Sequence, residues 1–404
     1  MARSYEVLLN ELPVGVLDIG TGDTSAFRIR EEYLFHNPRP VLGQTFEEDL
    51  RRVHKATVRL PPFFSNLLPE GALRQYIARS RKVKSVREWL LLDYLGGDLP
   101  GAVIVRPVAS DSAEPTAGQD DADGGAGVLT TGRLRFSLAG VQLKLSMLQD
   151  GDRFTLPMRG TIGRWLVKLP DRNIPNVPET EFATLMWADR SGIPVPEHRL
   201  VAGEQLVDLP EGFETTGNCL AVRRFDRRDD GSRVHQEDFA QILGVYSDDK
   251  YSHTNYESLG RIILAVAGAD EFLRYVDYLM FVVLSGNTDA HLKNWSLRYE
   301  NGYRAALSPA YDQIAVVVYP NASDDRLALR LGKSTRFEDV TVASLERLAR
   351  AAGCDESLVR DRAGAAAERI RTGWQEVRDH VPLSAQARQR IEEHLKRVPV
   401  AHHR

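Results

Sequence analysis

The residues best suited to chemistry lie in a short polar stretch of the C-terminal half. Asp289 and Asn294 are separated by four residues, and a further acid, Asp312, follows along the chain. Phosphoryl transfer to a hydroxyl needs these side chains. One carboxylate orients or deprotonates the attacking hydroxyl, while an asparagine and a second carboxylate hold metal ions on the β- and γ-phosphates. The pattern therefore indicates Asp289 as the acid–base residue and Asn294 and Asp312 as metal ligands.

A plainer interpretation of this stretch is an ordinary loop, because Asp, Asn and His all favour turns. The order of the neighbouring elements favours chemistry. An apolar helix is predicted over Asp270–Leu284, and the hairpin after Asn294 has Asn301 and Gly302 at its turn, which readily adopt the positive φ angles needed there. Protein kinases carry the same Asp-x-x-x-x-Asn spacing in their catalytic loop. His291, inside this spacing, is therefore a further candidate catalytic residue.

A lysine on a predicted strand is the second candidate. Lys168 lies in the apolar run Arg164–Leu169, where a charge is costly unless it is paired. ATP phosphates would supply the pairing, but a lysine on the solvent face of an edge strand would look the same. The helix predicted next, Thr180–Ser191, starts with Thr180 as its cap. Its Glu181 could hold Lys168 in place or be a surface acid.

Two weaker candidates flank this strand. The stretch Ser137–Lys144 has one glycine and matches neither the Walker A sequence nor the Gly-x-Gly-x-x-Gly motif. It nevertheless precedes Lys168, where a phosphate-covering loop would lie. A plain amphipathic strand is the alternative. Arg223 and Phe225 end another predicted strand, Leu220–Phe225, and could form a hinge whose backbone reads the adenine edge; a charged strand exit is the alternative. The candidate nucleotide contacts in the first stretch are Ala139, Gly140, Val141, Gln142 and Lys144.

Composition limits the classes of protein. The chain has 404 residues, which suits two or three domains, and a net charge of −4, which argues against binding nucleic acid through a general basic surface. Two cysteines, Cys219 and Cys354, make a disulfide framework improbable. The longest apolar stretch, Tyr278–Leu284, is too short to span a bilayer, and the N-terminus lacks a long apolar run. We expect a cytoplasmic protein with no membrane contact.

The elements that must position these residues form an α+β chain in which a β-rich part precedes a helical part. Strands are expected around Val53–Leu60, and a helix capped by Ser85 is expected to end at Gly96 or Gly97. Residues 109–132 are acidic and rich in Gly, which predicts a mobile linker. After residue 236 helical periodicity dominates, most clearly in Val342–Ala352 and Ala363–His380.

Taken together and in order along the chain, these stretches resemble the HipA family of bacterial toxin kinases. The block Asn287–Asn294 matches the family's Asn-Thr-Asp-x-His-x-Lys-Asn, and Ser137–Lys144 resembles its Ser-x-Ala-Gly-x-Gln-x-Lys loop. Further matching stretches are Phe63–Gly71, Trp165–Pro170, Arg223–Arg227, Val234–Gln241 and Leu307–Asp312. Two departures are Arg223, where the family often has Glu, and the insertion at residues 109–132.

The resemblance implies a two-lobe protein-kinase-like α+β fold. Its units would be an accessory subdomain (1–108), a linker (109–132), an N-lobe (133–235) and a helical C-lobe (236–404). It also implies ATP and Mg²⁺ as cofactors, transfer of phosphate to a serine or threonine of a protein, and self-phosphorylation at Ser137. The best known target class is an aminoacyl-tRNA synthetase. The implied partner is a small helix-turn-helix, HipB-like antitoxin, through which DNA would be contacted indirectly.

Two other functions stay open at this point. The chain could be a degenerate kinase fold that serves as a co-repressor with a DNA-binding partner, or a small-molecule or lipid kinase. The joint presence of Lys168, Asp289, Asn294 and Asp312 favours an active protein kinase toxin, because a pure binding module has no physical need for all four.

Overall fold

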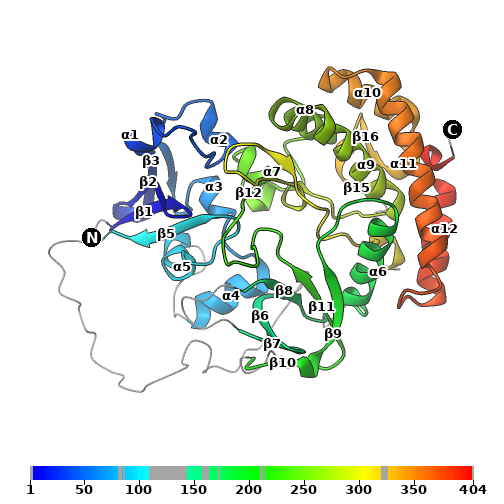
Figure 1. The fold of residues 1–404 in the computed structure, drawn as a ribbon, viewed down its shortest axis with the longest axis horizontal. Coiled ribbons are helices and arrows are strands. Elements are labelled where there is room, and N and C mark those ends of the chain that lie inside the picture. Colours follow the sequence, from blue (N-terminus) through cyan, green and yellow to red (C-terminus); the bar gives the residue numbers. More distant parts are fainter. Residues whose placement is uncertain are drawn as a thin grey trace.

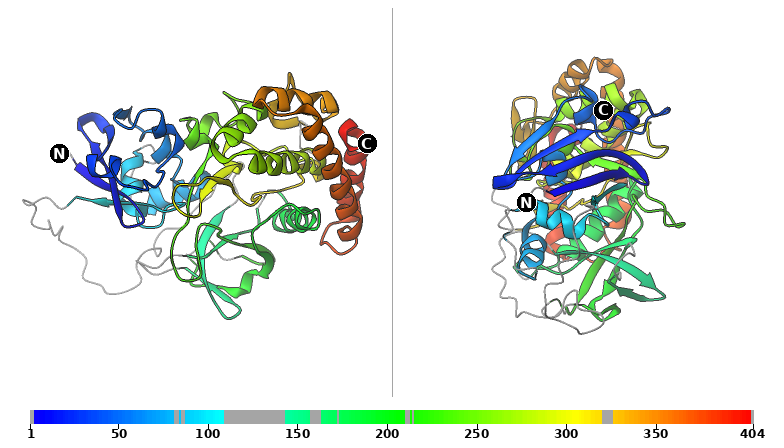
Figure 2. Two further views of the ribbon diagram at one scale, coloured as in Figure 1. Left: turned by 45° about the horizontal axis from the view of Figure 1, so that its top comes forward. Right: turned by 90° about the vertical axis from the view of Figure 1, so that its left-hand side faces the viewer.

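A computed structural model describes most of the chain. The described residues are 3–80, 84, 87–108, 143–156, 163–171, 173–209, 213, 215–319 and 326–402. Five predicted site residues and the predicted linker, residues 109–132, lie outside them; the five are Ser137, Ala139, Gly140, Val141 and Gln142. Figures 1 and 2 place the first hundred residues at one end of the molecule and the C-terminal helices at the other. The α+β class is confirmed.

The N-terminal unit is a five-stranded antiparallel sheet with short helices on it. The strand order is β4-β3-β2-β1-β5. The strands are β1 (Arg3–Leu9), β2 (Leu12–Ile19), β3 (Thr24–Ile29), β4 (His54–Thr57) and β5 (Val103–Pro107), and the helices are α1 (Glu31–Leu34), α2 (Gln44–Glu47), α3 (Pro62–Ser65), α4 (Gly71–Ser80) and α5 (Glu88–Leu95).

The helix expected after Ser85 ends at Gly96 as predicted, whereas the predicted cap Ser85 lies outside the described residues. Helix α5 begins at Glu88, directly after Arg87. The buried Glu88 carboxylate accepts hydrogen bonds from Leu60 N (2.8 Å) and Ser65 Oγ (2.9 Å). Glu88 thus fastens two segments that the sequence pattern could not relate to it, instead of closing a capping box.

The second unit is a six-stranded sheet of order β10-β7-β6-β8-β11-β9 with helix α6 (Val177–Arg190) packed on strands β9 and β11. Asn176, in a left-handed conformation, occupies the cap position of α6, so the predicted cap Thr180 is wrong. The Thr180 hydroxyl instead donates to Asn176 O inside the first turn (2.7 Å). The strands are β6 (Lys144–Asp150), β7 (Arg153–Thr155), β8 (Trp165–Lys168), β9 (His198–Ala202), β10 (Leu206–Val207) and β11 (Asn218–Arg223).

The third unit is helical and is built around α9, which is buried along most of its length. Helices α8, α11 and α12 pack against it. The helices are α7 (Phe239–Ile242), α8 (Tyr256–Ala267), α9 (Ala269–Ser285), α10 (Val342–Ala352), α11 (Glu356–Val377) and α12 (Ala385–Arg397). Predicted α9 and α10 are confirmed, whereas α11 begins seven residues before the predicted Ala363 because Asp355 caps it there.

Two small sheets interrupt the helical unit. The predicted hairpin is confirmed as β13 and β14, and β12, which sequence periodicity did not reveal, pairs with β13. The strands are β12 (His235–Asp238), β13 (Ser296–Tyr299), β14 (Ala306–Leu307), β15 (Arg326–Leu331) and β16 (Ser334–Arg336). Short 3-10 helices lie in the connections, at Thr21–Asp23, Gly203–Gln205, Ser247–Asp249, Leu292–Asn294, Val316–Val318, Phe337–Asp339 and Pro399–Ala401.

Two large hydrophobic cores and one small cluster between α6 and β11 hold the described units together. One core is shared by the N-terminal unit and the six-stranded sheet, and the other fills the helical unit. A buried polar cluster adds to the contact: Asp98 Oδ1 lies 3.1 Å from Arg224 Nη1 and 3.0 Å from Arg227 Nη2, and Asp226 Oδ2 accepts from Gly101 N (2.8 Å). The N-terminal unit is therefore fixed to the strand exit at residues 224–227.

Candidate active site

The loop that follows α9 is shaped by its own polar groups. Gly286 ends α9 with φ near +69°, and a side chain there would meet Val317 at 2.4 Å, so this turn requires glycine. Asn287 Oδ1 accepts from Asp289 N (2.9 Å), and Asn294 Nδ2 donates to Asp289 O (2.8 Å). Two asparagine side chains therefore hold the backbone of Asp289 from both sides.

The Asp289 carboxylate itself faces outward. About half of its side chain is exposed (48%), and Oδ1 accepts a hydrogen bond from the phenol of Tyr251. His291 Nε2 lies 3.9 Å from the same oxygen. Burial lowers the pKa of His291 to about 4, so its imidazole is neutral near pH 7. This accessible carboxylate, oriented by the phenol of Tyr251, can accept a substrate proton, whereas His291 is suited to packing beside it.

Asp312 lies across the site on a turn with φ near +53°. Its Oδ2 is 2.5 Å from Lys144 Nζ, and its Oδ1 binds Lys168 Nζ. Burial alone would raise the pKa of Asp312, but the two ammonium groups outweigh burial and hold it well below its usual value. Asp312 is therefore ionised at all ordinary pH values, as a metal ligand must be.

Lys168 is the buried member of this group, with 2% of its surface exposed. Strand β8 lies between β6 and β11, so the edge-strand alternative is wrong. Its ammonium group also pairs with Glu181 of α6, which settles the open question about Glu181. Burial lowers the pKa of Lys168, but Asp312 and Glu181 outweigh it and raise the pKa above its usual value. The lysine stays charged, as a phosphate ligand requires.

A buried network connects the two halves of the site. The hydroxyl of Tyr278 lies 3.3 Å from Asn294 O and 3.4 Å from Tyr311 O, and Gln313 Nε2 donates to it (2.7 Å). The Tyr311 hydroxyl donates to Lys293 O (2.7 Å). The turn that carries Asp312 and the loop that carries Asn294 are thus tied together, and sequence spacing gave no signal for Tyr278 or Gln313.

The predicted hinge is partly committed to the sheet. Arg223 N donates to Glu197 O (2.8 Å), and Arg224 N donates to Arg164 O (2.9 Å), so neither amide is free to read an adenine edge. The ring of Phe225 lies 5.5 Å from that of Tyr311, beside the turn of Asp312. Phe225 therefore borders the site, whereas the Arg223 side chain reaches Glu197 and Asp229 away from it.

A magnesium ion would fit only with help from the nucleotide. Within the described ranges, no group of three or more His, Cys, Asp or Glu side chains could hold a metal ion. Asn294 uses its Nδ2 atom on Asp289 O, which leaves Oδ1 to face a cation, and Asp312 supplies a carboxylate. Mg²⁺ is commonly held by one or two such oxygens plus phosphates and water. The donor set suits a metal that arrives with ATP.

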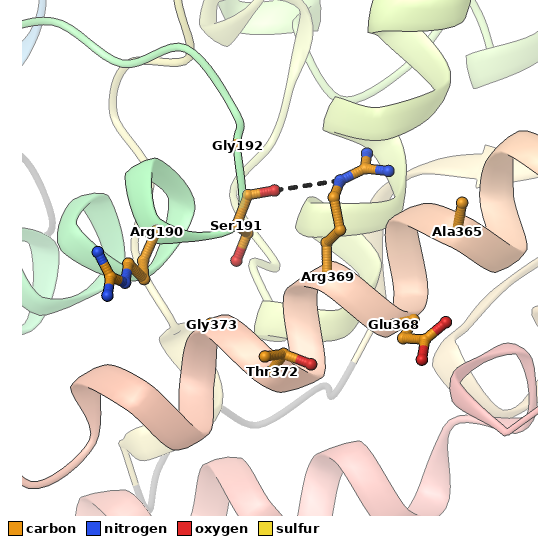
Figure 3. Close-up of a pocket in the computed structure, with 8 residues that line it drawn as sticks. All are labelled: Arg190, Ser191, Gly192, Ala365, Glu368, Arg369, Thr372 and Gly373. Atoms are coloured by element: carbon orange, nitrogen blue, oxygen red, sulfur yellow. Dashed lines mark hydrogen bonds between the residues drawn. The ribbon is translucent and has the colours of Figure 1, made fainter.

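One surface cavity of the described chain lies away from these residues. It has a volume of about 440 Å³ and opens between the C-terminal end of α6 and helix α11 (Figure 3). None of the predicted site residues lines it, and its Arg369 Nε approaches Ser191 O at 3.4 Å. The lining residues are Arg190, Ser191, Gly192, Ala365, Glu368, Arg369, Thr372 and Gly373.

None of the described helices is long and apolar enough to cross a membrane.

Comparison with known proteins gives consistent matches. Residues 5–106 match the HipA N-terminal domain, and residues 136–378 match the HipA-like C-terminal domain. The protein Y4dM of Sinorhizobium fredii, whose name carries a provisional kinase assignment, is 38% identical over 401 residues, covering 97% of this chain and 96% of Y4dM. The serine/threonine-protein kinase toxin HipA of Shewanella oneidensis is 25% identical over 296 residues, covering 64% and 63%.

A solved structure matches the whole fold. It is the complex of HipA, HipB and operator DNA from the Shewanella oneidensis MR-1 toxin–antitoxin system, with a TM-score of 0.75 at 22% identity, covering 98% of this chain and 96% of that chain. The two-lobe kinase-like architecture with an N-terminal accessory subdomain is therefore confirmed.

Proposed function

The chain belongs to the HipA family, and from that premise we propose that it is an ATP- and Mg²⁺-dependent serine/threonine protein kinase. The observation that carries the proposal is the convergence of Lys144 and Lys168 on Asp312. Two cations beside one ionised carboxylate form a site for phosphate oxygens and a divalent ion. The proposal needs no residue that the chain lacks.

Each side chain then has one task. Lys168, held by Glu181, binds phosphate oxygens, and Lys144 does so from the neighbouring strand. Asn294 Oδ1 and Asp312 would hold Mg²⁺, which supplies charge neutralisation on the phosphates when bound. Asp289 accepts a hydrogen bond from the substrate hydroxyl and takes its proton, because its carboxylate is the exposed acid of the loop.

Self-phosphorylation at Ser137 is the regulatory part of the proposal. Ser137 precedes Lys144 by seven residues. A phosphate there would add roughly −1.5 to −2 charges at neutral pH, seven residues along the chain from one of the proposed ATP-binding cations. It would compete with the nucleotide for Lys144 and Lys168 and switch the enzyme off. Peptide mapping after incubation with Mg²⁺-ATP tests this, and phosphate found only at other residues would contradict it.

The biological role proposed is that of a toxin with a HipB-like partner. The related Shewanella HipA structure contains HipB and operator DNA. A net charge of −4 suits a chain that reaches DNA only through a basic, helix-turn-helix antitoxin. The protein substrate proposed is an aminoacyl-tRNA synthetase. Sub-micromolar, sequence-specific DNA binding by the isolated chain at physiological salt would contradict the partner's role.

Mass spectrometry of the purified protein after incubation with Mg²⁺-ATP tests the central proposal. We expect a mass gain of one phosphate that does not form when EDTA is present from the start of the incubation, and growth inhibition in cells that depends on Asp289. The Asp312→Asn variant, in which we expect no transfer, is the negative control. Absence of both ATP binding and phosphate transfer would instead indicate a binding module, and transfer only to a small molecule or lipid would indicate a different substrate class.

A further inference from the structure

The N-terminal unit reaches into the candidate active site through the turn between α3 and α4. Lys293, one residue before Asn294, points at this turn rather than at solvent. Its Nζ lies 3.0 Å from Asn66 O and 3.1 Å from Asn66 Oδ1, and it also pairs with Asp238 at 2.9 Å and Glu70 at 3.5 Å. The catalytic loop is therefore fastened by a subdomain that begins over two hundred residues earlier.

Glu70 makes a second connection to the same loop. Its Oε2 accepts from Lys250 Nζ (2.9 Å), and the carbonyl of Lys250 accepts from Leu292 N in the catalytic loop (3.2 Å). The next residue, Tyr251, donates to the carboxylate of Asp289. The Glu70 carboxylate thus binds both Lys250 and Lys293. Lys293 directly precedes Asn294, and Lys250 directly precedes Tyr251, so each lysine adjoins a residue that bonds to Asp289.

Electrostatics gives these contacts a reason. Lys250 and Lys293 both approach Glu70, so their like charges need a shared anion. Burial alone would raise the pKa of Glu70, but Lys293 and Lys250 outweigh it and hold the pKa below its usual value. Glu70 is therefore ionised whenever the protein is folded near neutral pH. Without the charge of Glu70, Lys250 would lose the carboxylate that it binds, and the loop would lose one of its two connections to the N-terminal unit.

We propose that Glu70 is a positioning residue for phosphoryl transfer, through which the N-terminal unit aligns the Asp289 loop. This inference rests on the proposed kinase function for its activity readout. A misalignment of about 1 Å in a reacting group can slow a reaction roughly 100-fold. The Glu70→Gln variant should accordingly reduce kcat by roughly 10- to 100-fold and leave ATP affinity within about twofold, because Glu70 contacts none of the nucleotide lysines.

A matched control is available in the same subdomain. Glu47 also has a side chain that is 26% exposed, and it pairs with Arg39 at 2.6 and 2.8 Å without touching the catalytic loop. The Glu47→Gln variant removes a comparable ion pair. It should lower thermal stability about as much as Glu70→Gln does and leave kcat unchanged. Equal kcat in the two variants would overturn the positioning role.

Hydrogen exchange supplies a readout that does not depend on activity. The Leu292 amide, bonded to the carbonyl of Lys250, is the direct reporter. In Glu70→Gln, exchange in the peptide covering Asn287–Asn294 should speed up at least about tenfold, against no change in Glu47→Gln. Lys250→Met should act alike, and the double variant should add nothing further. Unchanged exchange in Glu70→Gln would refute the inference, whereas faster exchange in a chain that transfers no phosphate would refute only the kinase proposal.

Discussion

Lys144 and Lys168 stand directly opposite each other on the antiparallel strands β6 and β8, and both ammonium groups reach one carboxylate. Like charges in this position repel each other. The pair is tolerated because Asp312 lies between the two groups. In the structure Asp312 and Glu181 together balance the two lysines. A metal ion on Asp312 would free both ammonium groups for nucleotide phosphates.

The two lysines should contribute unequally to ATP binding. Lys168 is buried and fixed by Glu181, whereas Lys144 is a third exposed at its side chain. We expect Lys168→Met to weaken ATP binding at least about tenfold, or roughly 1.4 kcal/mol, and Lys144→Met to weaken it less. Calorimetric titration measures both, with the exposed Lys55→Met as control. Wild-type affinity in Lys168→Met would exclude it from the nucleotide site.

Removing the Asp312 charge should separate the metal from the nucleotide. Asp312→Asn is expected to abolish Mg²⁺-dependent transfer, because a neutral amide is a poor ligand for a divalent cation. In EDTA, however, the variant should bind ATP at least as tightly as the wild type, because Lys144 and Lys168 are released to the phosphates. Transfer activity within about tenfold of wild type would show that Asp312 is not a metal ligand.

Replacing Asp289 should slow phosphoryl transfer and leave ATP affinity nearly unchanged. Asp289→Asn is expected to slow phosphoryl transfer by roughly 10²–10⁴-fold, the scale of a positioned general base. ATP affinity should stay within a few-fold, since the phosphate ligands Lys144 and Lys168 do not contact Asp289. A radiolabel transfer assay beside calorimetry separates the two effects, and Asp361→Asn, on the exposed face of α11, is the control. Full transfer in Asp289→Asn would reduce this residue to a turn former.

Local chemistry accounts for what the sequence predicted well. The spacing of Asp289 and Asn294, the hairpin at Asn301 and the lysine at 168 are readable because each depends on near neighbours along the chain. The cap at Thr180 was predicted wrongly, since Asn176 precedes the helix in a left-handed conformation. The capping-box role expected of Glu88 is replaced by hydrogen bonds to a distant segment.

Other parts of the site had no local signal. Glu70 and Tyr251 matter only because folding places them beside residues far away in the chain. The β12 strand is recognisable only through its pairing with β13. A single sequence carries the side chains of such contacts but not their partners, so spacing alone could not reveal them.

A buried carboxyl group should make stability depend on pH. Glu237 accepts from Tyr299 Oη (2.6 Å) and Gln44 N, and burial raises its pKa to about 8 against the ordinary 4.5, with Tyr299 opposing. The folded chain thus holds this proton more tightly than the unfolded chain. Its contribution to stability is fully present below about pH 4.5 and is lost as the pH rises through about 8.

The corresponding test uses Glu237→Gln, which stays neutral at every pH. Between pH 6 and pH 8 the wild type should lose roughly 2 kcal/mol of unfolding free energy from this group, and the variant should lose little of it. The neighbouring His235, whose pKa burial lowers to about 4, is neutral in the folded chain but takes up a proton near pH 6.5 in the unfolded chain, so it favours folding as the pH rises. Both proteins share this opposite trend, and the difference between them isolates Glu237. Chemical denaturation at both pH values gives the measurement; parallel slopes in the two proteins would assign the titration to another group.

The first two units are joined in two ways. The chain connects them through residues 109–132, and folding connects them through the shared core and the cluster of Asp98 with Arg224 and Arg227. Along the chain, residues 109–132 are the obvious place to cut. Cleavage of the backbone there would break the covalent connection and leave the packed interface between the first two units in place. A protease that nicked this stretch would yield two pieces on a denaturing gel but a single particle in native chromatography. Genetic deletion of the first 108 residues is a different operation. It removes Asp98, leaves Asp226 as the remaining carboxylate beside the two arginines, and exposes one side of a core.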